Sequence, residues 1–237
     1  MKTILSFFAF LLAGLSLAWA APSGEVTHLS GTLSVLKADG SSKLLSVKSQ
    51  IAEGDVLTTE ADSYARIKFV DGAEVVLRPN TRFKVERYRF EEGKPEGDNV
   101  FVSLLKGGLR TVTGLIAKRN KDKVAYQTPT ATIGIRGTHF GALFCQGDCG
   151  ELRTAAGDIP ANGLHVDVAA GAISLTNNAG SFEFAAGQFA FVPDALRPPE
   201  LVPPERAIRV TMPSAIATNR GLGDGIGARN SSECSVE

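Results

Sequence analysis

The sequence predicts an all-β fold built from many short strands, with little helix. Apolar residues recur at every second position over residues 26–90 and again over 164–191, and turn residues separate these runs at roughly ten-residue intervals. The 25 glycines are spread along the 237 residues, which favours short elements joined by tight turns over long helices. Short strands at this spacing are typical of a sandwich, a barrel or a solenoid.

Residues 1–20 precede the first predicted strand and are typical of an export signal. A lysine at position 2 is followed by an apolar run, and the segment ends in Ala18-Trp19-Ala20, which matches an A-x-A cleavage site. The run is shorter than the ~20 apolar residues that span a bilayer. We therefore expect cleavage after Ala20, a periplasmic or secreted mature chain, and no membrane span after cleavage. An uncleaved membrane anchor is the alternative.

Turn signals divide residues 26–90 into short strands. Asp39-Gly40 and Asp71-Gly72 are each followed by renewed apolar alternation, and an Asp-Gly pair in that setting predicts a tight turn between paired strands. The alternation slips by one position near Glu86-Arg87, which predicts a β-bulge there.

The middle of the chain continues the strand pattern. Val100–Leu105 and Leu109–Val112 read as two strands with a turn at Gly107-Gly108. A helix over residues 100–117 is the competing interpretation, and each glycine in it would destabilise that helix by ~1 kcal/mol. The charged run Lys118–Lys123 is expected to be a solvated hairpin tip.

The mature chain is expected to hold three cysteines, at positions 145, 149 and 234. In an oxidising compartment Cys145 and Cys149 can close a small loop, in which Gly147 supplies backbone freedom. The alternative is a pair of zinc ligands, but a structural zinc site needs four ligands and the sequence has no second cysteine pair. We expect a Cys145–Cys149 disulfide and no metal site. Cys234 is left either as a free thiol or as an intermolecular linker.

Changes of composition set off three expected segments from the β-rich region between them. These are a signal peptide at 1–20, a proline-rich strapping segment at 194–220 and a disordered tail at 221–237. Within the β-rich region, His165 and Asp167 share one face of a predicted strand and could ligate a metal. Exposed polar residues on the outer face of a strand are the commoner case, and we expect that here.

Charge balance and motif content exclude several classes of function. The 25 Lys and Arg residues face 25 Asp and Glu residues, so no net field would draw nucleic acid or an anionic bilayer to the chain. The sequence contains no H-E-x-x-H, G-x-S-x-G or phosphate-loop motif. We therefore expect a protein that is not an enzyme, binds no nucleic acid and uses no cofactor.

The segment Thr128–Phe140 departs from the plain strand pattern. Gly134 and Gly137 flank Ile135-Arg136; the glycines permit close backbone approach or positive φ, and the guanidinium offers five fixed donors. Two interpretations stay open. Arg136 either caps carbonyls or pairs with a carboxylate inside the fold, or it recognises an anionic group of a partner.

Three stretches of the sequence resemble the FecR-domain family of exported β-rich regulators. They are Gly54–Gly72, Leu105–Gly114 and Thr128–Phe140, the last being close to the pattern T-P-T-A-x-x-G-I-R-G-T. The resemblance implies a twisted solenoid-like or sandwich-like all-β domain on the far side of the inner membrane, without catalytic residues. It implies a FecR-like β domain at residues 21–145 and a β-rich continuation of the same fold at 146–193. The candidate binding residues that lie in these stretches are Arg136, His139 and Arg110.

The resemblance also sets the expected function. In the named regulators the domain belongs to a membrane-spanning anti-sigma protein that relays a signal from an outer-membrane receptor, whereas we expect neither an anti-sigma region nor a later membrane helix in this chain. We expect a non-catalytic periplasmic module that binds an envelope protein in a sensory or regulatory assembly. One alternative is a glycan- or peptidoglycan-binding structural protein, which the lack of tryptophan after Trp19 disfavours. A hydrolase that uses His165 or Asp167 is a further alternative.

Overall fold

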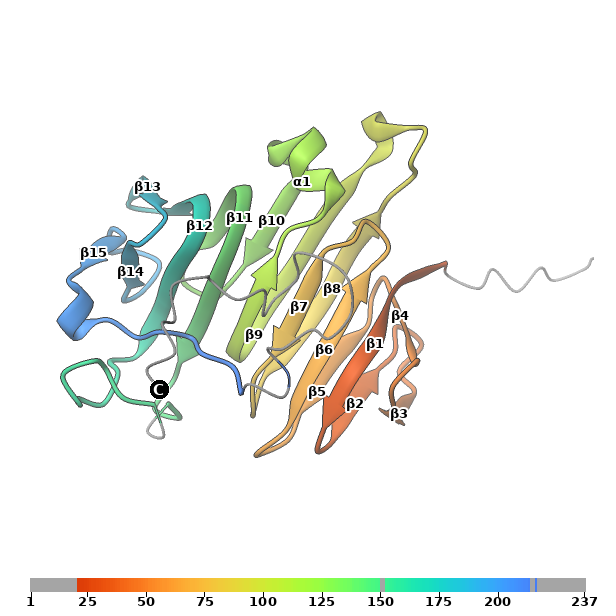
Figure 1. The fold of residues 1–237 in the computed structure, drawn as a ribbon, viewed down its shortest axis with the longest axis horizontal. Helices are drawn as coiled ribbons and strands as arrows, with labels where there is room; N and C mark the ends of the chain where they lie inside the picture. The colour runs from red at the N-terminus through yellow and green to blue at the C-terminus, as the bar shows by residue number, and fades with distance from the viewer. Residues whose placement is uncertain (1–20, 150–151, 214–215, 217–237) are drawn as a thin grey trace, which may run out of the picture.

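The computed structural model describes residues 21–149, 152–213 and 216, which fold mostly into β-strands (Figure 1). The strands are β1 Pro22–Ser30, β2 Leu33–Leu36, β3 Ser42–Leu45, β4 Gln50–Ala52, β5 Val56–Thr59, β6 Tyr64–Phe69, β7 Glu74–Leu77, β8 Arg82–Arg89, β9 Asn99–Val112, β10 Val124–Gln127, β11 Thr132–Cys145, β12 Gly163–Asn177, β13 Gly180–Ala185, β14 Phe189–Val192 and β15 Glu200–Val202. The helical elements are α1 Leu115–Arg119 and the 3-10 turns η1 Pro95–Gly97, η2 Lys121–Lys123 and η3 Pro204–Arg206. The expected all-β fold with little helix is confirmed. The predicted signal peptide, the predicted tail and Cys234 lie outside the described residues.

Hydrogen bonds join the described strands into one mixed sheet, which folds into two layers. The first layer runs in the order β15, β14, the start of β12, the end of β11, the end of β9, β7, β6, β1 and β4. The second layer runs in the order β13, the end of β12, the start of β11, β10, the start of β9, β8, β5, β2 and β3. The pairs formed by described residues are antiparallel, apart from β9 with β10.

Three long strands belong to both layers, and each passes from one layer to the other at a glycine. Gly107 in β9, Gly137 in β11 and Gly171 in β12 have φ angles of +76°, +63° and +73°. Residues with a side chain rarely adopt this backbone conformation. A Cβ atom on Gly171 would also lie 2.3 Å from the carbonyl oxygen of Gly137. These glycines let the sheet fold over, and the result is sandwich-like in cross-section.

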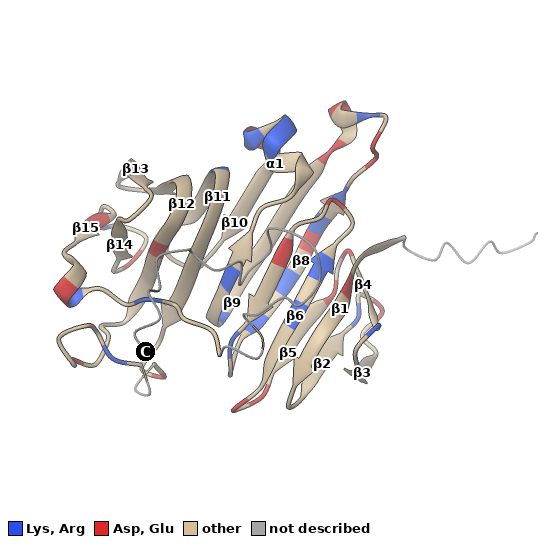
Figure 2. Ribbon diagram, viewed as in Figure 1, with Lys and Arg blue, Asp and Glu red and all other residues tan. Residues whose placement is uncertain are grey.

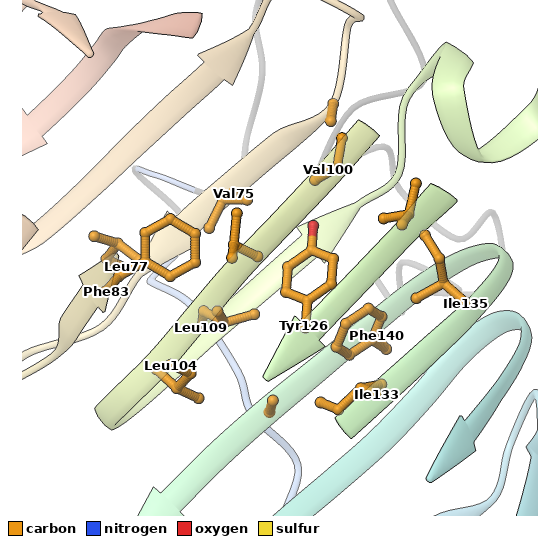
Figure 3. Close-up of a cluster of buried hydrophobic side chains, with 14 of the residues drawn as sticks. Val75, Leu77, Phe83, Val100, Leu104, Leu109, Tyr126, Ile133, Ile135 and Phe140 are labelled. Carbon is orange, nitrogen blue, oxygen red and sulfur yellow. The ribbon is translucent and has the colours of Figure 1, made fainter. Parts of the chain in front are cut away.

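The hydrophobic core lies between the two layers (Figure 3). It is filled by every second residue of the strands on both sides, including Val75, Leu77, Phe83, Leu104, Leu109, Ile133 and Ile135. Aromatic pairs join the layers: the rings of Phe69 and Tyr88 stack at 4.3 Å, and those of Tyr126 and Phe140 meet edge to face at 5.3 Å. The side chains that point the other way form the outer face of each layer.

Several local predictions are confirmed. Asp39-Gly40 joins β2 to β3 and Asp71-Gly72 joins β6 to β7, with φ angles of +84° at Gly40 and +82° at Gly72. The register of β8 against β9 shifts between Val85 and Arg87, as a bulge near Glu86 requires.

Two local predictions are wrong. Gly107-Gly108 is not a turn, because β9 continues through it and uses Gly107 to change layer. Lys118–Lys123 is not a hairpin tip either, since its residues belong to α1 and η2. These helical turns connect β9 to β10, which run parallel, and parallel neighbours need a crossover connection. No helix in the described part of the chain is long and apolar enough to cross a membrane.

Candidate functional site

An extended segment, Ala207–Met212, crosses the outer face of the first layer, and we call it the strap. In Figure 1 it is the blue stretch that leaves η3 and passes over β12, β11 and β9. Ile208 and Val210 are buried, whereas Arg209 between them and Thr211 after them are exposed. The strap lies on the outer face because its buried residues pack on Leu143 and not on the core between the layers.

A polar cluster from three strands holds the centre of the strap. Arg110 of β9 donates two hydrogen bonds from Nη1 to the carboxylate of Asp167 in β12, at 2.9 and 3.1 Å, and a third from Nη2 at 2.9 Å. Its Nε donates to Nε2 of His139 in β11 at 2.9 Å. The strap residue Val210 donates from its backbone nitrogen to Asp167 at 2.8 Å and accepts at its carbonyl from Arg110 at 2.9 Å. The ion pair therefore binds both backbone groups of one strap residue.

The local sequence makes room for this cluster. Gly141 of β11 pairs with Arg110 on one side and with Asp167 on the other. A Cβ atom at Gly141 would lie 2.6 Å from both Oδ2 of Asp167 and Cβ of Val210, and 2.8 Å from Nη1 of Arg110. Because real Cβ atoms do not approach so closely, a glycine here allows the ion pair to form beneath the strap.

The electrostatics of the cluster keep its histidine neutral. Burial and the Arg110 guanidinium lower the pKa of His139 to about 4, while Asp167 acts in the opposite direction. Neutral His139 can accept the hydrogen bond that Arg110 donates. Burial also lowers the pKa of His165, whose Nε2 donates to the carbonyl oxygen of Ala161 at 2.8 Å. Basic residues on β6, β8 and β9 lie among acidic ones (Figure 2), and at the site itself Arg110 is paired with Asp167.

Apolar contacts flank the polar cluster. Ile208 and Val210 pack on Leu143 and on the disulfide between Cys145 and Cys149, whose Cα atoms are 5.5 Å apart. Farther along the chain, Met212 and Ile216 pack against the outward side chains of β6, β7 and β9, which are Tyr64, Val76 and Val112. The disulfide is therefore part of the surface on which the strap lies.

A cleft lies near each end of the strap. The cleft beside η3 has a volume of about 200 Å³, and its lining includes His165, Phe191, Leu201 and Arg206. The cleft at the other end has a volume of about 170 Å³, and its lining includes Tyr64, Arg78, Leu143 and Leu152. Arg78 also donates a hydrogen bond to the carbonyl oxygen of Thr211. Both clefts stay open with the strap in place.

The structure brings two of the three predicted binding residues together. Arg110 and His139 are in contact beneath the strap. Arg136 lies apart from them, on the outer face of the second layer, where it forms an ion pair with Glu183 of β13 at 2.5 Å. Its side chain is 50% exposed and that of Glu183 is 59% exposed. Of the two interpretations of Arg136, pairing with a carboxylate occurs, but on the surface and not inside the fold.

The expectation for His165 and Asp167 is wrong. Both lie on one strand face, but they are 8% and 6% exposed, because the strap and the chain beside it cover this part of β12. The sequence singles out Asp167 only as a possible metal ligand or hydrolase residue, and its pairing with Arg110 was missed. The only signal for that pairing was an acidic side chain within an apolar strand. Among the described residues, no group of three His, Cys, Asp or Glu side chains is placed to hold a metal ion.

Comparisons with known proteins find similarity to parts of the chain. A sequence model described as FecR protein matches residues 55–174. The comparison with curated proteins gives no match. Among solved structures, a cell surface anchoring domain is 27% identical and covers 27% of this chain and 83% of its own, with a TM-score of 0.26.

Two crystal structures of a candidate anti-sigma factor from Parabacteroides distasonis ATCC 8503 are also similar. They are 13% and 14% identical to this chain, with TM-scores of 0.44 and 0.45. Each match covers 62% of this chain, which spans 58% of the length of those chains.

The FecR match runs from the start of β5 into β12. It contains Arg110, His139 and Asp167, whereas the strap lies outside it. It also crosses residue 145, where the sequence suggests a boundary between segments, and that boundary stays a prediction. Because the match covers half of the chain, the protein belongs to the FecR protein family.

Proposed function

We propose that this chain is a non-catalytic interaction module of a sensory or regulatory assembly in the cell envelope, and that it recognises a protein partner. Membership of the FecR family supports the regulatory role. The observation that carries the proposal is the Arg110–Asp167 pair, which binds the backbone N–H and C=O of Val210. An outer face that recognises one extended polypeptide segment in this way is suited to protein recognition.

The polar groups of the site already have partners, which supports a binding role over catalysis. Both oxygens of Asp167 accept hydrogen bonds, and Nε2 of His139 accepts one from Arg110. A general base needs a free lone pair within reach of a substrate proton. Arg110 and His139 thus remain proposed binding residues that act through the strap surface, and Arg136 is a proposed contact on the opposite layer.

We place the mature protein in the periplasm or outside the cell. The Cys145–Cys149 disulfide supports this location, because disulfides persist in oxidising compartments. The Ala18-Trp19-Ala20 sequence supports cleavage of an export signal after Ala20.

Site-specific photo-crosslinking in living cells tests the partner proposal. A photoreactive amino acid is placed at Ile159, an exposed residue that lines the open cleft beside η3, and at Val47, an exposed residue between β3 and β4, as the comparison. We expect a protein adduct at Ile159, identified by mass spectrometry, and a weaker adduct or none at Val47. If no protein adduct forms at either position and the purified chain co-sediments with peptidoglycan, the glycan-binding alternative would replace this proposal.

A further inference from the structure

We propose that the groove beneath the strap is the partner-binding surface itself, and that an extended aliphatic segment of the partner displaces the strap from it. The groove is defined by Arg110, Asp167 and Leu143 together with the disulfide. This inference rests on the proposed function. In this inference the strap occupies the groove until the partner segment takes its place.

The way in which the strap is held allows its release. A strand within a sheet exchanges backbone hydrogen bonds with its neighbour. At the centre of the strap, both backbone groups of Val210 bind side chains instead, and the carbonyl of Thr211 accepts from the side chain of Arg78. Removing the strap breaks these side-chain contacts and one backbone hydrogen bond, from the Ala155 nitrogen to the Ala207 carbonyl oxygen, and leaves the β9–β11 and β11–β12 hydrogen bonds in place.

The same contacts define the chemistry of the partner. An N–H and a C=O group are present at every residue except proline, where the N–H is missing, so the Arg110–Asp167 pair selects an extended backbone and not a particular side chain. Selectivity comes from the apolar positions: Ile208 is 2% exposed and Val210 is 0% exposed. The partner segment should therefore carry branched aliphatic residues at alternate positions, separated by residues whose side chains face solvent.

The open clefts explain how a partner could compete with a tethered strap. A short tether gives the strap an effective concentration on the order of millimolar, so a competitor needs contacts that the strap does not make. The clefts of about 200 and 170 Å³ at the two ends offer such contacts. Ile159 and Leu201, which line the first cleft, are 62% and 61% exposed in the presence of the strap. A longer extended segment would cover this apolar surface.

A peptide binding in trans tests the inference with purified protein. The probe is a fluorescein-labelled peptide with the sequence of residues 203–213, PPERAIRVTMP, and binding is followed by fluorescence anisotropy. Val210→Asp in the chain should release its own strap, because it places a charge in an apolar site next to the Asp167 carboxylate. Val47→Asp is the matched control, since Val47 is exposed at 46% and lies outside the groove.

We expect the Val210→Asp chain to bind the peptide at least about tenfold more tightly than the unchanged chain or the Val47→Asp chain, because the intact strap competes in the other two. Adding Asp167→Asn to the Val210→Asp chain should abolish this gain, and adding Lys94→Ala, which breaks an exposed ion pair with Glu91 outside the groove, should preserve it. Equal binding by all three chains, or equal binding of a peptide that itself carries Val210→Asp, would overturn the inference. If Val210→Asp prevents folding, Ile208→Ser provides the same test.

The peptide and crosslinking experiments separate the two proposals. Peptide binding without protein crosslinks in cells would support an accessible groove and remove the partner proposal. Protein crosslinks from Ile159 without peptide binding would keep a partner and remove the groove as its binding surface.

Discussion

Replacing Asp167 by Asn is the perturbation whose effect follows most directly from the structure. The substitution keeps the size of the side chain but removes the negative charge from a pair whose side chains are 8% and 16% exposed. It leaves the Arg110 guanidinium beneath the strap without a counterion. Breaking a buried pair by removing one partner costs about 3–5 kcal/mol, and the partial exposure of Arg110 places this site at the lower end, about 3 kcal/mol.

Urea unfolding followed by circular dichroism measures this loss, and Arg136→Ala is its control. Arg136 and Glu183 form an exposed ion pair, so its removal should change the free energy of unfolding by no more than about 0.5 kcal/mol. For a chain of this size, a loss of about 3 kcal/mol corresponds to a decrease in Tm of about 6–12 °C. If Asp167→Asn lowered the free energy of unfolding as little as Arg136→Ala does, the Arg110–Asp167 pair would not stabilise the packing of the strap on the first layer.

Three further predictions follow from the same contacts. Gly141→Ala should destabilise the chain by about 2 kcal/mol or more, because its Cβ would meet Asp167 and Val210 at 2.6 Å. Gly97→Ala, whose Cβ would have nothing within 4 Å, should be neutral in the same urea assay. Equal effects of the two substitutions would contradict the packing at Gly141. Below pH 6.5 the unfolded chain binds a proton at His139 that the folded chain does not bind until about pH 4, so stability should fall by up to about 2 kcal/mol as the pH decreases through this window. Unfolding at a series of pH values should show that His139→Gln reduces this slope; an unchanged slope in His139→Gln would refute the assignment. Replacing Cys145 and Cys149 together by serine should cost about 2 kcal/mol and increase the deuterium uptake of the strap more than that of β1; unchanged strap uptake would show that the disulfide does not support it.

Local features of the fold could be predicted because short-range chemistry determines them. Asp71-Gly72 forms a hairpin since its backbone preference and the flanking alternation agree. Cys145 and Cys149 are four positions apart, and their pairing needs only a small loop. Arg110 and His139 could be singled out because each lies in a stretch that resembles the family.

Long-range features could not be predicted in this way. Gly107 looked like a turn residue because a single positive φ suits both a turn and a strand that changes layer, and only the pairing partners distinguish the two. The role of Asp167 depends on Val210, which lies 43 residues farther along the chain, and on Arg110, which lies 57 residues before it. Periodicity predicts which face of a strand is polar, but it does not indicate that another segment will cover that face.

Deuterium exchange at the Val210 amide tests the central claim that the strap is a displaceable occupant of a binding groove. This amide donates to Asp167 and is protected while the strap is bound. We predict that it exchanges through local opening, at a free energy at least about 2 kcal/mol below that of global unfolding, while the amides of β11 exchange only with global unfolding. Exchange of Val210 at the global free energy would show that the strap is an integral part of the fold, and would contradict the account.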